Sequence, residues 1–127
     1  MDRVIKIDNK DVGFRATALT PRLYRHKMGR DVVQDLNHLR RAYNKAMELP
    51  DDATPEAIED AQLNSLDLEI FENVAWVMAR QYDAEHVPDS PELWLDEFAT
   101  FSIYEILPEI LTLWQLNQET TSHTKNQ

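Results

Sequence analysis

Only two glycines, Gly13 and Gly29, occur in this chain of 127 residues, and this scarcity constrains the fold more than any other feature. Glycine enters left-handed backbone conformations without steric cost, so a chain with so few glycines is poorly suited to many tight turns. A β-sandwich or a β-barrel needs such turns at short intervals along the chain. The sequence therefore favours a mainly helical fold.

One segment near the N-terminus has the pattern of a β-hairpin. Ile5 and Ile7 alternate with polar residues, and a second alternating run follows at residues 12–16. Between the two runs, residues 8–11 read Asp-Asn-Lys-Asp, a composition typical of turns. We expect a hairpin at about residues 3–18. Because two strands alone are marginally stable in water, it must pack against helices or against another chain.

Several helix boundaries are marked by capping residues. Thr20, Thr54 and Ser90 each stand directly before a proline, which is the arrangement of an N-cap followed by proline at the first helical position. Asp31 is a further candidate N-cap, and Gly29 is a candidate C-terminal stop. Together with the apolar spacing, these signals predict helices at about residues 21–28, 31–48, 55–82, 91–99 and 102–116.

The predicted helix at 55–82 carries two apolar stripes. A helix with a single buried side needs only one. Two stripes predict either a helix at the centre of a bundle or a surface shared with another subunit. One stripe consists of Leu63, Leu66, Ile70, Val74 and Val77, and the other of Leu68, Phe71, Ala75, Met78 and Tyr82.

These elements predict an α+β, mainly α fold with one domain at residues 1–116, in which the hairpin leads into a bundle of about five helical segments. Pro108 should kink or restart the last helix, because proline has no backbone N–H to donate. Residues 117–127 are polar and lack periodicity, so we expect a disordered tail there. The absence of cysteine and of any long apolar run is typical of a soluble intracellular protein.

Charge is distributed unevenly along the chain. Residues 1–49 contain 11 Lys and Arg against 6 Asp and Glu, a formal charge of +5. Residues 50–127 contain 2 against 17, a formal charge of −15, and the two parts give the net charge of −10. Three explanations remain open: steering toward charged partners, head-to-tail contact between copies of the chain, and internal pairing of the two parts.

Residues 13–31 form the most basic stretch. A helix-turn-helix with Gly29 in its turn would make the helix from Asp31 onward a recognition helix. Asp31 and Asp35 would then face the phosphates, so we favour contact with an acidic protein surface and keep a small DNA-binding regulator as the alternative. The candidate contact residues are Arg22, Arg25, Lys27 and Arg30.

The three tryptophans have different expected roles. Trp76 lies in the middle of a predicted helix and is expected in the core. Trp94 and Trp114 lie on short or kinked elements, where tryptophan either fills a core or anchors a binding partner. Core packing is the favoured role, and both residues are kept as candidates for apolar contact with a partner.

The sequence contains no recognisable catalytic motif. No two of its histidines are spaced to place two metal ligands on one helix face, and no nucleophile elbow or phosphate-binding glycine loop occurs. Carboxylate pairs such as Glu69 with Glu72, or Asp96 with Glu97, are the basis of the one enzymatic alternative. We therefore predict that the protein is not an enzyme and has no catalytic residues, no metal site and no cofactor.

The order of the segments resembles a known family. An N-terminal I-K-I-D-N-K-D-V-G-F-R-A-T-A is followed by T-P-R-L-Y-R-H-K-M-G-R-D, a long central helix and a terminal I-L-P-E-I-L-T-L-W. This arrangement is similar to that of the tail assembly chaperones of long-tailed bacteriophages and prophages of Gram-positive bacteria. The resemblance covers residues 3–116.

The resemblance implies a non-enzymatic protein made in the cytoplasm of the bacterial host and absent from the mature virion. Such proteins bind and solubilise the tape measure protein and help to recruit the major tail (tube) protein around it. The resemblance also implies a homo-oligomer and a longer form of the same chain produced by translational frameshifting. It implies neither a nucleic-acid partner nor a membrane partner.

Overall fold

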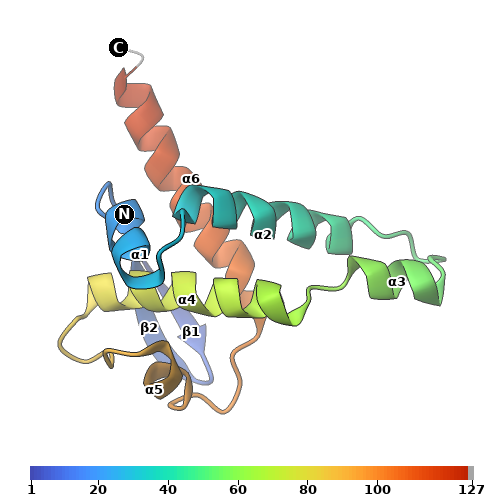
Figure 1. Cartoon of the computed structure of the whole chain (residues 1–127), viewed down its shortest axis with the longest axis horizontal. Helices are drawn as coiled ribbons and strands as arrows, with labels where there is room; N and C mark the ends of the chain where they lie inside the picture. Colours follow the sequence, from blue (N-terminus) through green and yellow to red (C-terminus); the bar gives the residue numbers. More distant parts are fainter. Residues whose placement is uncertain (126–127) are drawn as a thin grey trace.

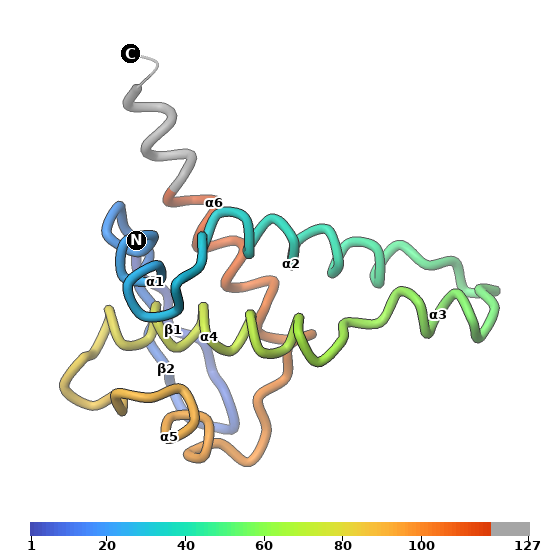
Figure 2. Tube along the Cα trace, viewed as in Figure 1, coloured from blue at the N-terminus to red at the C-terminus, as the bar shows by residue number. Residues whose placement is uncertain are grey.

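The structure is a computed structural model that describes residues 1–125, with side chains described for residues 1–117 (Figures 1 and 2). It has an α+β, mainly α fold in which an N-terminal hairpin precedes the helices, as the sequence predicts. The elements are β1 (Asp2–Ile7), β2 (Lys10–Arg15), α1 (Thr20–Met28), α2 (Val32–Met47), α3 (Pro55–Ala61), α4 (Ser65–Tyr82), α5 (Pro91–Leu95) and α6 (Ile103–Lys125).

The predicted hairpin is confirmed. β1 and β2 pair antiparallel through a two-residue turn, in which Asp8 and Asn9 have φ values of 53° and 64°. Positive φ at both turn residues is the requirement of a type I′ turn, and Asp and Asn tolerate it better than other non-glycine residues. The inner face of the hairpin buries Ile5, Ile7 and Phe14. The alternation of the sequence thus corresponds to one buried side and one side that is more exposed.

The hairpin is held against the helical part of the chain at both ends. At its tip, the Asp8 carboxylate accepts a hydrogen bond from the backbone N–H of Ala99 at 2.8 Å. Near its start, Arg3 forms an ion pair with Glu109 of α6. These contacts, together with the packing of β2 on α4, supply the cover that an isolated two-stranded sheet lacks.

Most of the predicted helix signals are confirmed. The side chains of Asp31, Thr54 and Ser90 each accept a hydrogen bond from the first turn of the helix that follows. Gly29 ends α1 with φ of 67°, the left-handed conformation that favours glycine. The N-cap role of Thr20 is wrong: the residue lies inside α1, where its buried hydroxyl group is engaged in other hydrogen bonds.

The prediction of one continuous helix at 55–82 is also wrong. The chain is extended at Gln62 and forms two helices, α3 and α4. A capping box restarts the helix. The Asn64 side chain accepts from the N–H of Asp67 at 2.9 Å, and the Asp67 carboxylate accepts from the N–H of Asn64 at 3.0 Å. The N–H groups of Asn64 and Asp67 lie at the start of a new helix, where they have no backbone partner within that helix, and the reciprocal pair satisfies both.

Two other boundaries differ from the prediction. The helix expected at 91–99 ends at Leu95. α6 is a single helix across Pro108, so the helix does not restart there. The carbonyl that loses its partner to Pro108 belongs to Tyr104, in the exposed first turn of α6. α6 is assigned through Lys125, but the side chains from residue 118 onward and residues 126–127 lie outside the description, so the disordered tail at 117–127 stays a prediction.

α4 lies at the centre of the fold, which confirms one of the two roles expected from its double stripe. All six residues from Val74 to Ala79 are buried. β2, α1, α2, α5 and α6 all contact this helix, and Figure 1 shows it running between them. Leu66 and Leu68, near its first turn, are exposed. No helix among the described residues has the length and apolar character needed to cross a membrane.

An aromatic cluster closes the core beneath α4. The Trp94 ring meets Phe14, Phe98 and Phe101 edge-to-face, with centroid distances of 6.3, 5.4 and 5.2 Å. Edge-to-face geometry is favourable because the positive edge of one ring faces the negative face of the other. Trp94 therefore joins the hairpin to the segment that follows α5.

Replacing Trp94 tests this role. We expect Trp94→Ala to lower the free energy of unfolding by about 3–5 kcal/mol, because the substitution removes a large buried ring and leaves a cavity. Its neighbour Leu93 is 60% exposed, so Leu93→Ala should change the same quantity by less than about 0.5 kcal/mol. Urea denaturation followed by circular dichroism measures both, and similar values for the two variants would contradict the core role.

Gly13 is required by a close approach to Tyr82. A Cβ atom at this position would lie 2.0 Å from Cε1 of the Tyr82 ring, although the backbone of Gly13 has an ordinary negative φ. The same ring faces the guanidinium group of Arg15, at 5.6 Å from the ring centroid. The end of α4 thus lies directly on β2.

A double-mutant cycle tests this contact. We expect Gly13→Ala to destabilise the protein by about 1–3 kcal/mol, because the added methyl group overlaps the ring. In a Tyr82→Ala background the same substitution should cost much less, because the ring is gone. Denaturation midpoints of the four proteins give the coupling. An equal cost of Gly13→Ala in both backgrounds would show that the ring is not the cause.

Candidate functional site

α1 presents three of the predicted contact residues to solvent. Arg22, Arg25 and Lys27 are exposed, and none of their side chains has a hydrogen bond or ion pair with another residue of the described part of the chain. The opposite side of the helix is fixed to the core through buried Tyr24 and Thr20. The cationic side chains are therefore free to meet a partner.

Arg30 differs from the other candidates because it is engaged within the chain. Its guanidinium group donates two hydrogen bonds of 2.8 Å to the two carboxylate oxygens of Asp35. The buried hydroxyl group of Tyr24 donates a third bond of 2.7 Å to the same carboxylate. This cluster joins the two ends of the turn between α1 and α2, so Arg30 has a structural role there. Its side chain is also 50% exposed, so the partner contact expected from the sequence stays a prediction.

The environment of Asp35 shifts its pKa. Burial acts to raise the pKa of Asp35, but the hydrogen bonds from Arg30 and Tyr24 and the positive charge of Arg30 outweigh it, so the pKa lies below its usual range. Burial, and then the hydrogen bond to Asp35, raise the pKa of Tyr24, which keeps the phenol neutral. The ionised carboxylate is thus the stable form in the folded protein.

The burial of Asp35 also corrects an argument about DNA. The sequence places Asp31 and Asp35 where a DNA backbone would approach. In the structure Asp35 is buried, and the Asp31 carboxylate accepts the N–H of Val33 at 2.8 Å as a helix cap. The Asp35 carboxylate is ionised but is paired with Arg30 inside the fold, so its charge is offset and does not face an approaching DNA backbone.

A pocket of about 240 Å³ lies between α1 and α4, and we call it the α1–α4 pocket. Buried Trp76 and Val77 form its apolar wall, and Lys27 and Arg80 add cations to its lining. The Arg80 guanidinium is held in place by a 2.8 Å hydrogen bond to the carbonyl of Val87. The complete lining is Leu23, Lys27, Trp76, Val77, Arg80, Gln81 and Ala84.

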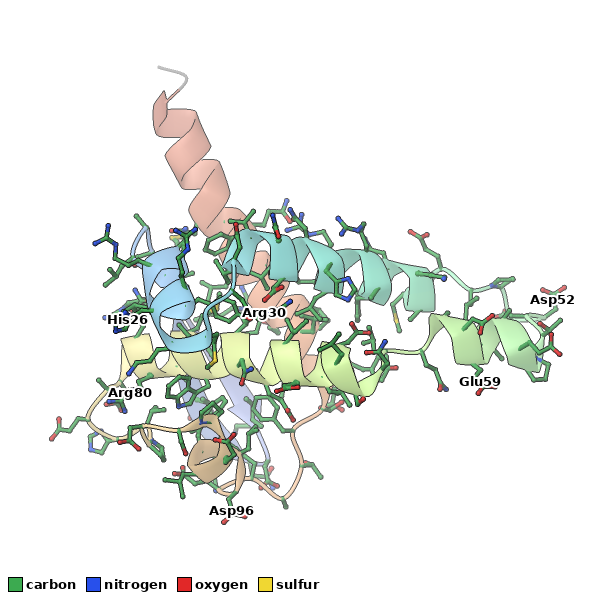
Figure 3. All side chains as sticks on the ribbon, in the orientation of Figure 1. His26, Arg30, Asp52, Glu59, Arg80 and Asp96 are labelled. Carbon is green, nitrogen blue, oxygen red and sulfur yellow. The ribbon has the colours of Figure 1, made fainter. Side chains whose placement is uncertain are left out.

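Arg80 was missed by the sequence reasoning, although one signal points to it. It is the only Lys or Arg between residues 50 and 124, a stretch rich in carboxylates. The fold brings it to the same end of the molecule as His26 of α1 (Figure 3). Arg80, although it stands alone among acidic residues in the sequence, thus lies with the cations of α1 in the folded protein.

Trp94 and Trp114 do not belong to an exposed site. Their exposed fractions are 2% and 4%, and both lie in the core. An indole ring anchors a partner only where the partner can reach it. Of the two roles expected from the sequence, core packing is the one that the structure has, and both residues are removed from the candidate partner-binding set.

The opposite end of the molecule is acidic. We call residues 47–61 the acidic arm; it comprises the end of α2, the following loop and α3. Figure 3 shows Asp52 and Glu59 at one end of the long axis, and His26 and Arg80 toward the other. The exposed carboxylates of the arm are Glu48, Asp51, Asp52, Glu56, Glu59 and Asp60, and its exposed large apolar side chains are Met47 and Ile58.

Internal pairing does not account for the uneven charge. Among the described side chains, a single ion pair of a Lys or Arg with a carboxylate joins residues 1–49 to residues 50–127, namely Arg3 with Glu109. His38 contacts Asp67 at 2.6 Å, which adds one contact between the two parts. The cationic and acidic ends therefore remain largely available to other molecules.

The carboxylate pairs named in the sequence have different surroundings. Burial, and then the charge of nearby Glu69, raise the pKa of Glu72. Asp96 and Glu97 are exposed in the segment after α5. Within the described residues, no group of three or more His, Cys, Asp or Glu side chains is arranged to hold a metal ion.

Comparison with protein-family models, curated proteins and solved structures finds no match to this chain.

The Asp35 cluster makes a testable prediction about pH. Because its pKa is lowered in the folded state, Asp35 contributes stability above about pH 4, the usual range of an unfolded Asp, and loses it as the pH falls through the folded value. We expect Asp35→Asn to cost about 1.5–3 kcal/mol at pH 7. The difference from wild type should shrink as the pH falls below 4.

Denaturant unfolding of both proteins between pH 7 and pH 3 measures this difference. Asp11→Asn, at an exposed position on the hairpin, controls for the loss of one surface charge. A difference between wild type and Asp35→Asn that is constant over the whole pH range would argue against an ionised Asp35 in this cluster.

Proposed function

We propose that the protein is a non-enzymatic tail assembly chaperone of a long-tailed bacteriophage or prophage. In this proposal it binds and solubilises the tape measure protein in the cytoplasm of the bacterial host, helps to recruit the major tail (tube) protein, and is absent from the mature virion. The homo-oligomer and the frameshift-extended form belong to the same proposal.

The observation that carries the proposal is the separation of charge along the long axis. A cationic α1 at one end and an acidic arm at the other are surfaces suited to contact with several protein partners at once. The order of hairpin, basic helix, central helix and terminal helix adds to this support, because the resemblance rests on that order.

Within this proposal, Arg22 and Arg25 meet the acidic side chains of a long helical partner. Both are exposed on α1 and lie one turn apart on the same face, so they can contact carboxylates at matching spacing on another helix. Contacts of this kind are individually weak. A chaperone that coats a long protein gains affinity from their repetition, because linked contacts add avidity.

The test is co-expression with the tape measure protein of the same phage. The wild-type chain should keep that protein soluble and co-purify with it, whereas Arg22→Glu/Arg25→Glu should lose most of the captured partner. Lys6→Glu reverses a charge at an exposed position on the hairpin, outside α1, and serves as the control. Failure of the wild-type chain to retain the tape measure protein would refute the proposal.

A DNA-binding regulator is the second candidate, because the pairing of Asp35 with Arg30 weakens one of the sequence-based arguments against it. The exposed side of α2 carries Gln34, His38, Arg41 and Lys45, which are residues able to contact bases or phosphates. The net charge of −10 weighs against it. A gel-shift titration of duplex DNA at low salt separates the two proposals: binding that weakens steeply with salt supports the regulator, and no shift supports the chaperone.

A further inference from the structure

We propose that the acidic arm of one copy docks into the α1–α4 pocket of the next copy, so that the protein associates head to tail. The inference deepens the proposed function and rests on it for the biological role of the assembly. The contact itself involves only this chain, so it is tested without the tape measure protein. A monomeric chain would remove the homo-oligomer from the proposed function but leave the binding of the tape measure protein standing, and loss of that binding would leave the head-to-tail contact standing.

The pocket has the size and lining for an aliphatic side chain. Its volume of about 240 Å³ exceeds the ~150 Å³ of an apolar cavity that holds benzene. Trp76 and Val77 are buried at its wall, and Leu23 is half-buried at its edge. The apolar surface that the pocket still exposes to water belongs to residues such as half-buried Leu23 and exposed Ala84. Covering this surface is favourable, because removal of apolar surface from water is the main favourable term in protein association.

The cations of the pocket specify what should accompany that side chain. Lys27 has no ion pair or hydrogen bond among the described residues. Arg80 uses one of its five N–H donors on the Val87 carbonyl, so further donors remain for a partner. The expected occupant is therefore an aliphatic side chain next to carboxylates.

The acidic arm carries this combination. Ile58 is 43% exposed on α3, while Ala61 on the same helix is buried, and α3 packs against α2. Glu59 and Asp60 follow Ile58 directly and are exposed, and neither forms an ion pair within the described residues. Successive side chains on a helix are turned by about 100°, so Glu59 flanks the face of Ile58, whereas Asp60 lies on the other side of α3. The arm thus offers an aliphatic side chain with one flanking carboxylate to a pocket with an apolar wall and two cations.

The positions of the two surfaces determine the kind of assembly. The arm cannot dock into the pocket of its own molecule, because Glu59 and Arg80 lie toward opposite ends of the long axis (Figure 3). A contact between two different surfaces is heterologous, so each copy keeps one free arm and one free pocket after the first contact. Repetition gives a row or a ring of copies, which is a suitable form for coating a long helical protein.

The first experiment is sedimentation velocity of the full chain over a range of concentrations. Wild type should form oligomers that grow with concentration and weaken as salt is raised, since opposite charges meet in the contact. Ala84→Trp should block the pocket, and Ile58→Ser/Glu59→Lys should disable the arm. Each should weaken self-association about tenfold or more, because each removes a central contact.

Two control variants change matching features elsewhere. Ala99→Trp adds an indole ring at an exposed alanine outside the pocket, and Asp96→Lys reverses a charge on an exposed residue away from the arm. Both should associate as wild type does. Circular dichroism and thermal melting of every variant establish that loss of association is not loss of folding.

The second experiment mixes the two disabled variants. The Ala84→Trp chain keeps its arm and the Ile58→Ser/Glu59→Lys chain keeps its pocket, so together they can make one contact and no more. A mixture should therefore give 1:1 dimers and nothing larger. A monomeric wild type at every concentration, unchanged association of either variant, or a mixture that stays monomeric or grows beyond dimers would overturn the proposal.

Discussion

The burial of α4 on nearly all sides is the constraint on which the rest of the structure depends. From Val74 to Ala79 every side chain is removed from water, so no face of this part of the helix can be left uncovered. The hairpin, α1, α2, α5 and α6 each supply part of the cover. Moving any one of these elements away would expose apolar surface of α4 to water, which costs about 25 cal/mol of stability for each Å² exposed.

This arrangement leaves the ends of the molecule for contact with partners. α1 is fixed through buried Tyr24, and the turn after it is held by the bidentate pair of Arg30 with Asp35. The positions of the exposed cations on α1 are therefore set by the core. The acidic arm extends beyond α4 at the other end (Figure 1), and Figure 3 shows its Asp52 and Glu59 far from His26 of α1.

The separation of charge has a physical consequence for association. Copies of a chain with a net charge of −10 repel one another on average. When the cationic end of one copy lies next to the acidic end of another, this repulsion is overcome, because opposite charges then meet at short range. Electrostatics of this kind selects orientation and partner more than it adds affinity, and the apolar α1–α4 pocket is the place where affinity can be gained.

The sequence by itself determined the hairpin, the caps at Asp31, Thr54 and Ser90, and the double apolar stripe of α4, because alternation, capping and periodicity depend on residues that are neighbours in the chain. Whether that double stripe faces the bundle or another subunit was decided by the tertiary structure. The capping box that separates α3 from α4 was equally local and was overlooked. Only the tertiary structure decided that Arg30 pairs with Asp35, that Trp94 and Trp114 are buried, and that Arg80 joins Lys27 beside one pocket. Arg30 and Asp35 are only five positions apart, but their pairing depends on Tyr24, which the core buries and which donates to the same carboxylate. The other features arise because residues far apart in the chain, such as Leu23 and Arg80, meet in space, and no local pattern encodes that meeting.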